Sequence, residues 1–260
     1  MANIIAVANQ KGGVGKTTTA INLAACVARR GCKTLLIDLD PQGNSTSGLG
    51  VERSALEFSV YDALINKTTI EKCALETGVD GLTLIPASVD LAGSEIEMVN
   101  MDGRESMLKN RVADYTEGFG YVFIDCPPSL SLLTINALTA ARSVLIPIQC
   151  EYFALEGLAQ LMNTVRLVKK TTNPALEIEG IVLTMFDGRT NLSAQVASEV
   201  KKAFGAKVYR TVVPRSIRLG EAPSYGKTIT DYAPASTAAS AYISLADELI
   251  NNSSKEADNG

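Results

Sequence analysis

A glycine-rich stretch at residues 11–18, with the sequence KGGVGKTT, constrains the fold of this chain more than any other feature. It follows an apolar run at 4–8 that predicts a buried strand, and it opens an amphipathic stretch at 16–30 that predicts a helix. Glycines let the backbone curl so that several N–H groups point at one anion, and the helix N-terminus adds partial positive charge. A plain turn before a helix is the alternative, but the Gly-Lys-Thr-Thr ending in this context favours a phosphate-binding loop.

The polar side chains of this loop have expected roles at a bound nucleotide. Lys16 is expected to reach the β- and γ-phosphates, Thr17 to ligate Mg²⁺ and Thr18 to donate to a phosphate. Lys11 is an additional lysine, and Gln10 stands where the standard pattern has glycine. The loop alone leaves two interpretations of Lys11, a role at the nucleotide or a solvated surface position. Backbone contacts to the phosphates are predicted for Gly12, Gly13, Val14 and Gly15.

Carboxylates follow two further apolar runs that predict strands. The run at 34–37 ends in Asp38 and Asp40, and the run at 121–124 ends in Asp125. An apolar strand that ends in aspartate is the Walker B arrangement, which holds Mg²⁺ or its waters. One carboxylate of the first pair is expected to support Mg²⁺ through water and the other to orient an attacking water. A pair that only caps a loop is the alternative.

The order of apolar runs predicts an α/β fold with one domain over residues 1–250. Continuously apolar runs are typical of strands covered on both faces, and their alternation with helices predicts a mostly parallel, doubly wound sheet. The polar residues 251–260 predict a disordered tail. The expected strands are 4–8, 34–37, 82–85, 121–124, 144–148, 178–184 and 208–213, and the main helices are 16–30, 131–141, 155–171, 192–204 and 237–251.

Composition limits the available chemistry. The chain has no histidine, so catalysis must rest on carboxylates, lysines, hydroxyls and bound metal. Its five cysteines form no C-x-x-C pair, which argues against a zinc site or a disulfide framework. The first residues lack the basic and apolar regions of a signal peptide, and no apolar stretch is long enough to span a bilayer. We therefore expect a cytoplasmic protein that does not bind membrane.

The net charge of −4 conceals a basic segment. Between residues 189 and 227 there are eight basic and two acidic residues, so this segment carries +6 and the rest of the chain −10. A basic surface on an acidic protein still binds phosphates. Lysines on the helix expected at 192–204 have a simpler interpretation as a solvated face, so the arginines of the segment are the better candidates for binding.

The motifs together resemble those of a known family. Residues 11–18, the DLDPQG sequence at 38–43 and the DCPP sequence at 125–128 look like those of the deviant Walker A ATPases, a branch of the P-loop NTPases. Within that branch the chain resembles the ParA/Soj chromosome-partitioning proteins over about residues 2–250. The segments at 44–50, 187–192, 213–216 and 221–224 also match.

The resemblance implies a role for each matching residue. In that family the lysine equivalent to Lys11 reaches across a dimer to the nucleotide of the partner. Asp40 matches the residue that orients the hydrolytic water, and Asp38 and Asp125 match the carboxylates that support Mg²⁺. The segment Pro214, Arg215 and Ser216 matches residues around the base. The arginines that match non-specific DNA-binding positions are Arg189 and Arg218, with Arg215 as a further candidate that could instead flank the nucleotide.

The family also implies partners and an activity. The expectation is an Mg²⁺-dependent ATPase that dimerises with ATP, binds double-stranded DNA non-specifically, and is stimulated by a ParB/Spo0J-type centromere-binding protein. Its expected location is the nucleoid. The alternatives are a MinD-like division-site ATPase, which needs a membrane-binding C-terminal helix, a redox protein like the nitrogenase iron protein, which needs a second cluster-ligating cysteine, and a P-loop metabolic enzyme.

Overall fold

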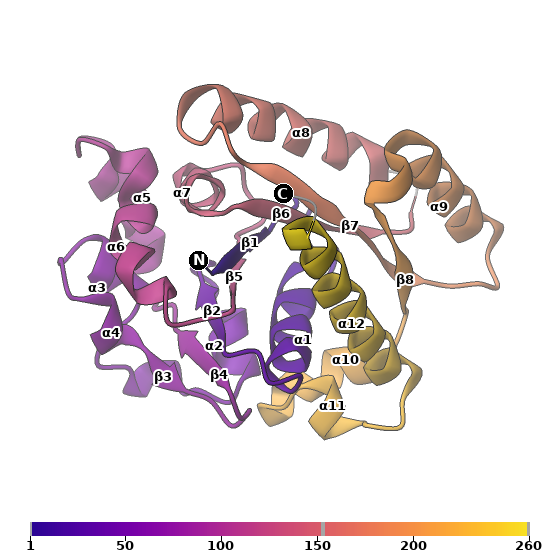
Figure 1. Ribbon diagram of the computed structural model, residues 1–260. Helices are drawn as coiled ribbons and strands as arrows, with labels where there is room; N and C mark the ends of the chain where they lie inside the picture. The colour runs from indigo at the N-terminus through magenta and orange to yellow at the C-terminus, as the bar shows by residue number, and fades with distance from the viewer. Residues whose placement is uncertain (1, 152–153, 259–260) are drawn as a thin grey trace.

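The computed structural model describes residues 2–151 and 154–258, and in that part of the chain eight strands form one sheet (Figure 1). Their order is β3-β4-β2-β5-β1-β6-β7-β8, and every neighbouring pair is parallel except β3 with β4. The strands are β1 Asn3–Val7, β2 Thr34–Asp38, β3 Leu75–Glu76, β4 Leu82–Ile85, β5 Tyr121–Asp125, β6 Ser143–Gln149, β7 Glu177–Phe186 and β8 Val208–Pro214.

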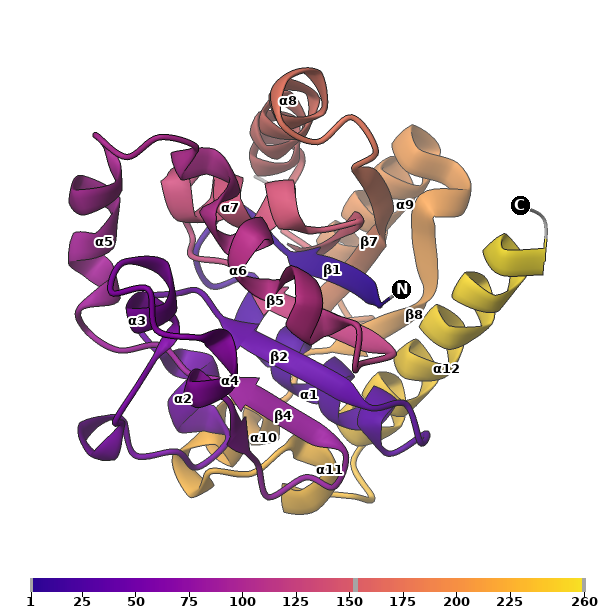
Figure 2. The ribbon, with the colours of Figure 1, turned by 60° about the vertical axis from the view of Figure 1, so that its left-hand side comes forward.

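Helices cover both faces of this sheet. Helices α1 and α12 pack together on one face, and α7, α8 and α9 lie on the other (Figure 2). The helices are α1 Lys16–Ala28, α2 Asn44–Gly48, α3 Val60–Leu64, α4 Ile70–Cys73, α5 Leu91–Met98, α6 Met107–Thr116, α7 Leu132–Ala140, α8 Ala154–Thr171, α9 Asn191–Phe204, α10 Ile217–Glu221, α11 Ile229–Tyr232 and α12 Thr237–Asp258. No helix in the described residues combines the length and apolarity needed to cross a bilayer.

Side chains of the central strands alternate between two apolar cores. In β1, Ile5 and Val7 pack against the helices of the α1 and α12 face, whereas Ala6 belongs to the core of the opposite face. All three are fully buried. Successive side chains of a strand point to opposite faces, so a strand covered on both faces must be apolar at every position. This explains why the strands are continuously apolar runs and confirms the predicted doubly wound α/β fold.

The sequence predictions differ from the structure mainly in the short elements. The seven predicted strands and five predicted helices are all present, with ends that shift by a few residues at most positions. Several elements were not predicted. They are the two-residue strand β3, the short helices α2 to α4, α10 and α11, and the helices α5 and α6. Elements of four or five residues contain too few positions to display a helical or strand period.

The prediction for the C-terminal residues is the one that the structure corrects most clearly. Helix α12 continues through the stretch predicted to be a disordered tail, as far as Asp258, and residues 259–260 lie outside the described part. The preceding turns of α12 are anchored by the buried side chains Tyr242, Leu245 and Leu249. Within the corrected stretch, Ser253 Oγ accepts a hydrogen bond from Asn3 Nδ2 at 3.1 Å. Propagation of a helix costs far less than its nucleation, so a packed helix extends into polar sequence that contains no proline or glycine.

Candidate nucleotide site

The glycine-rich loop joins the carboxyl end of β1 to the start of α1, in the centre of the sheet. Gly13 and Gly15 have φ of 74° and 88°, values that favour glycine. Apart from each glycine and its chain neighbours, no atom of the described residues lies within 4 Å of the position that a Cβ would take at Gly12 or Gly13, so the loop faces open space. Its underside is anchored, because Thr184 Oγ1 of β7 donates to the Val14 carbonyl at 2.8 Å. This gives a rigid cradle with room for an anion.

Lys16 lies at the first position of α1 and is only 6% exposed. Its Nζ donates to the Lys11 carbonyl at 3.0 Å, so the side chain folds back over the loop. Burial lowers the pKa of this ammonium, and the nearby Asp125 and Asp40 oppose that shift. A cation in this position and environment fits the phosphates of a nucleotide, which would replace the stabilisation lost on burial.

Two carboxylates meet at the ends of neighbouring strands. Asp38 and Asp125 are paired in the register of β2 with β5, and both side chains are fully buried. Asp38 Oδ2 accepts from the backbone and hydroxyl of Thr46 at 2.8 and 2.7 Å, and Asp125 Oδ2 accepts from Ser45 Oγ at 2.8 Å. Burial raises the pKa of both carboxyls, and their mutual repulsion adds to the shift of Asp125. The two hydroxyl residues of α2 were not singled out from the sequence.

The environment of Asp125 fits a hydrated Mg²⁺. Its Oδ1 is buried and has no hydrogen-bond partner among the described residues, and the nearby Thr17 side chain lowers the pKa of the carboxyl, against the effect of burial. In the described residues, no group of three or more Asp, Glu, His or Cys side chains forms a cage for a metal ion. Mg²⁺ is commonly bound through one or two protein ligands, phosphate oxygens and several waters, so this sparse donor set is compatible with it.

Asp40 lies just beyond β2 at the beginning of a tight turn. Its Oδ1 accepts from the Gln42 amide at 2.9 Å, and its carbonyl accepts from the Gly43 amide at 2.8 Å. The Asp40 amide in turn donates to Asp38 Oδ1 at 3.2 Å. Asp40 is 6% exposed, and its charge contributes to the pKa of Lys16. The structure thus places this carboxylate at the same end of the sheet as the loop.

Lys11 contacts its own chain. Its ammonium forms an ion pair with Glu151, which follows β6, and its amide donates to Asn9 Oδ1 at 3.0 Å. About a third of each paired side chain is exposed, 32% for Lys11 and 33% for Glu151. The pairing with Glu151, 140 residues away in sequence, was not predicted. Lys11 therefore lies beside the loop, with its charge neutralised within the chain.

A cavity of about 330 Å³ opens beside the loop. Pro214, Arg215 and Ser216, which were predicted to surround the base, line it together with Gly15 and Thr18. Met185 adds to the wall with a φ of 49°, an uncommon conformation for a residue other than glycine. The remaining lining residues are Thr184, Val213, Ile217, Leu219, Gly220 and Tyr242. This cavity has the right position for the base of a nucleotide whose phosphates occupy the loop.

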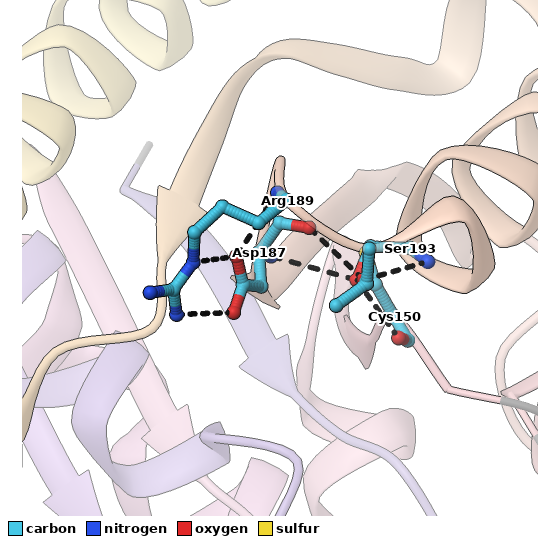
Figure 3. A network of polar contacts seen from close by, with 5 residues as sticks. Cys150, Asp187, Arg189 and Ser193 are labelled. Atoms are coloured by element: carbon cyan, nitrogen blue, oxygen red, sulfur yellow. Dashed lines mark hydrogen bonds and ion pairs between the residues drawn. The ribbon is translucent and has the colours of Figure 1, made fainter.

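The predicted DNA-binding arginines are all exposed and lie near the ends of β7 and β8. Arg189 is 88% exposed, and its guanidinium pairs with Asp187 through contacts of 2.9 and 2.7 Å (Figure 3). That pairing lowers the pKa of Asp187 to about 2, with a smaller contribution from Arg215. Ser193 of α9 joins this loop to the residue after β6, because its hydroxyl accepts from the Asp187 amide at 3.5 Å and donates to the Cys150 carbonyl at 3.5 Å (Figure 3). Arg215 and Arg218 follow on the next loop and α10.

Known proteins resemble this chain over nearly its whole length. Residues 2–178 match the family described as the AAA domain. The sporulation initiation inhibitor protein Soj of Bacillus subtilis is 56% identical over 252 residues, which are 97% of this chain and 100% of that protein. The chromosome partitioning protein ParA of Myxococcus xanthus is 50% identical over 250 residues, 96% of this chain and 88% of that protein.

Solved structures share the fold. Cobyrinic acid a,c-diamide synthase from Mycobacterium smegmatis, with bound ADP and magnesium, has a TM-score of 0.85 and 38% identity, covering 96% of this chain and 94% of that chain. The cell division ATPase MinD of Pyrococcus furiosus has a TM-score of 0.79 and 26% identity, covering 96% and 99%. The fold is therefore one that recurs in proteins named as ATPases or solved with a nucleotide.

Proposed function

Because the chain belongs to the ParA/Soj family of chromosome-partitioning ATPases, we propose that it segregates chromosomal or plasmid DNA by an ATP-driven cycle of DNA binding and release. The chain is an ATPase, and its cofactors are ATP and Mg²⁺. The observation that supports this function best is the convergence of Lys16, Asp40 and Asp125 around one loop at the carboxyl end of the sheet. Ligands of open parallel sheets bind at that end.

Each residue of the site has a distinct role in hydrolysis. Bound ATP supplies the phosphoryl group and bound Mg²⁺ neutralises its charge. Lys16 and the loop amides hold the phosphates, and Thr17 with Asp125 and Asp38 positions the metal and its waters. Asp40 orients the attacking water, in a site where no histidine is available as a base. Phosphoryl transfer depends mainly on such positioning and on electrostatic stabilisation.

The dimer depends on Lys11. Its proposed target is the phosphate region of the nucleotide in a second copy of the chain. To reach it, the ammonium must leave Glu151, and the phosphates offer a larger negative charge than that one carboxylate. ATP then favours association because it binds more tightly to the dimer than to the monomer. After hydrolysis this difference is lost and the dimer dissociates.

DNA binding rests on Arg189, Arg215 and Arg218. All three side chains are exposed and belong to the segment that carries +6. A dimer doubles the number of arginines that face one duplex, which links DNA binding to the ATP state. The partner is a ParB/Spo0J-type protein bound at a centromere, which accelerates hydrolysis. The protein is cytoplasmic and associates with the nucleoid while ATP is bound.

The test is a salt titration of binding to double-stranded DNA with ATP, with ADP and without nucleotide. We expect tight binding only with ATP, no sequence preference, and a log–log slope of about −0.9 for each phosphate neutralised. Arg189→Glu and Arg218→Glu should weaken binding on every sequence and flatten the slope while ATP binding persists. Lys109→Glu, an exposed position on α6, is the charge-matched control. Equal affinity in the three nucleotide states would refute the cycle.

The same assay discriminates a metabolic enzyme from a partitioning ATPase. The 38% identity with a cobyrinic acid a,c-diamide synthase is the observation that favours the metabolic alternative. That enzyme class has no reason to hydrolyse ATP faster when DNA is added. Stimulation of phosphate release by DNA therefore supports partitioning, and its absence supports the metabolic alternative.

A further inference from the structure

The turn that begins at Asp40 is held from outside by one arginine. Arg53 belongs to the short 3₁₀ helix Arg53–Ala55, which follows α2. Its Nη1 donates to the Gln42 carbonyl at 2.6 Å and its Nη2 to the Pro41 carbonyl at 3.1 Å. A guanidinium presents its N–H groups in a rigid planar fork, so two adjacent carbonyls bound together fix the orientation of the peptide units that carry them.

Gly43 allows this close approach. Its φ is 62°, and a Cβ built there would lie 2.6 Å from Arg53 Nε and 2.7 Å from Cζ. The guanidinium therefore occupies the space in which any other residue at position 43 would place its side chain. Arg53 Nε is buried and has no hydrogen-bond partner among the described residues, so contact with Gly43 excludes water from it. The arginine and the turn pack as one unit.

Gln42 links this unit to Asp40. Its carbonyl accepts from Arg53, and its amide donates to Asp40 Oδ1 at 2.9 Å. The Gly43 amide donates to the Asp40 carbonyl at 2.8 Å and closes the turn. When the peptide units on either side of Gln42 are fixed, the amide that orients the Asp40 carboxylate is fixed as well.

We propose that Arg53 is a positioning residue for ATP hydrolysis that sets the orientation of the Asp40 carboxylate through the Pro41 and Gln42 carbonyls. This rests on the role proposed above for Asp40. Both hydrogen bonds of Arg53 go to the turn after Asp40, so we expect it to act on the water-orienting group and not on nucleotide binding. A displacement of about 1 Å at a reacting group costs up to about 10²-fold in rate, so the contact has a large expected effect on turnover.

The first experiment compares Arg53→Ala and Arg53→Lys with the unchanged protein. Phosphate release gives kcat and KM, and a fluorescent nucleotide analogue gives the affinity of binding. For Arg53→Ala we expect kcat to fall by about tenfold to 10²-fold with nucleotide affinity changed by less than about twofold. Arg53→Lys should recover only part of the rate, because one ammonium cannot bind both carbonyls in the same fixed geometry. Added guanidinium ion should restore part of the activity of Arg53→Ala.

A second variant tests the same contact from the other partner. Gly43→Ala places a methyl group where the guanidinium lies and strains a backbone with a φ of 62°, so it should displace Arg53, lower kcat and lower thermal stability. Arg104→Ala is the matched control, because Arg104 also donates to a backbone carbonyl, that of Val99, outside the site. The control should keep the kcat and KM of the unchanged protein. Thermal unfolding of all variants reports any general loss of fold.

The outcomes separate this proposal from the proposed function. An unchanged kcat in Arg53→Ala would overturn it, and so would equal losses of kcat and nucleotide affinity, which indicate general disruption of the site. If Arg53→Ala does not fold, Arg53→Lys decides by the same criterion. If Asp40→Ala keeps the normal rate, the assignment of Asp40 fails instead, whatever the Arg53 variants do.

Discussion

At the scale of single residues, Lys16 and Asp40 have different proposed roles in one site, nucleotide binding and hydrolysis. Lys16 is a buried cation at the phosphate loop, whereas Asp40 sits on the turn after β2 and contacts backbone amides. We expect Asp40→Ala to bind ATP normally but to release phosphate at least about 10²-fold more slowly, as for a lost positioning or acid–base group. Lys16→Ala should fail at nucleotide binding itself, because the phosphates lose a charge-assisted contact. Equal defects in both variants, measured by binding and phosphate release, would contradict this division.

The buried carboxylates predict a pH dependence at the same scale. Burial and repulsion from Asp38 raise the pKa of Asp125 above its unfolded value. A raised carboxyl pKa stabilises the fold while the group is protonated, and this contribution is lost as pH rises through the folded pKa. Without nucleotide and with Mg²⁺ chelated, the free energy of unfolding should therefore fall as the pH rises from about 4 to about 8.

Asp125→Asn should flatten that dependence and abolish hydrolysis, because the amide does not ionise and is a poor partner for Mg²⁺. Urea unfolding at several pH values measures the first effect. The matched variant Asp187→Asn removes a partly exposed carboxyl whose pKa is lowered to about 2 by Arg189, so it should change the pH dependence of stability only at acid pH. The same steep dependence in Asp125→Asn as in the unchanged protein would contradict the assignment.

At the scale of elements, the edge strand β8 is protected by helix α12. Strand β8 pairs irregularly with β7, and Glu248 of α12 accepts from the Arg210 and Thr211 amides at 2.8 and 3.0 Å. Unpaired edge amides are a template for association with another strand. Glu248→Ala should lower the free energy of unfolding by about 1–3 kcal/mol, because it removes hydrogen bonds to a charged acceptor. The neighbouring Asp247→Ala removes only an exposed ion pair with Arg30 and should cost no more than about 1 kcal/mol in the same urea titration.

At the scale of the whole molecule, Lys11 is the residue whose contacts differ between the monomer and the proposed dimer. The ammonium is paired with Glu151 of its own chain and must change partner on association. Lys11→Ala should retain nucleotide binding but remain monomeric with ATP in light scattering, while Lys109→Ala, on an exposed face of α6, should dimerise normally. If Lys11→Ala still dimerised with ATP, Lys11 would have no role in the dimer beyond its contacts within one chain.

The fold and the phosphate loop were predictable because their signals are local. Residues 11–18 contain the glycines, the lysine and the hydroxyls of one continuous turn, and continuous apolar runs identify strands that are covered on both faces. The carboxylates Asp38 and Asp125 were predictable for a related reason, since parallel strands bring their carboxyl ends to one edge of the sheet. The helical end of α12 was predicted wrongly, because polar composition does not reveal that a packed helix continues into it.

By itself, then, the sequence determined the loop chemistry, the strand and helix order and the segment of basic charge, all of which depend on neighbouring residues. Only the tertiary structure decided which distant groups meet: Lys11 with Glu151, Arg210 and Thr211 with Glu248, and Arg53 with the Pro41 and Gln42 carbonyls. Such contacts form when crossovers and packing place separate segments side by side. A single charged side chain carries no periodic pattern that identifies its partner, so its contacts become known only once the backbone has been placed in space.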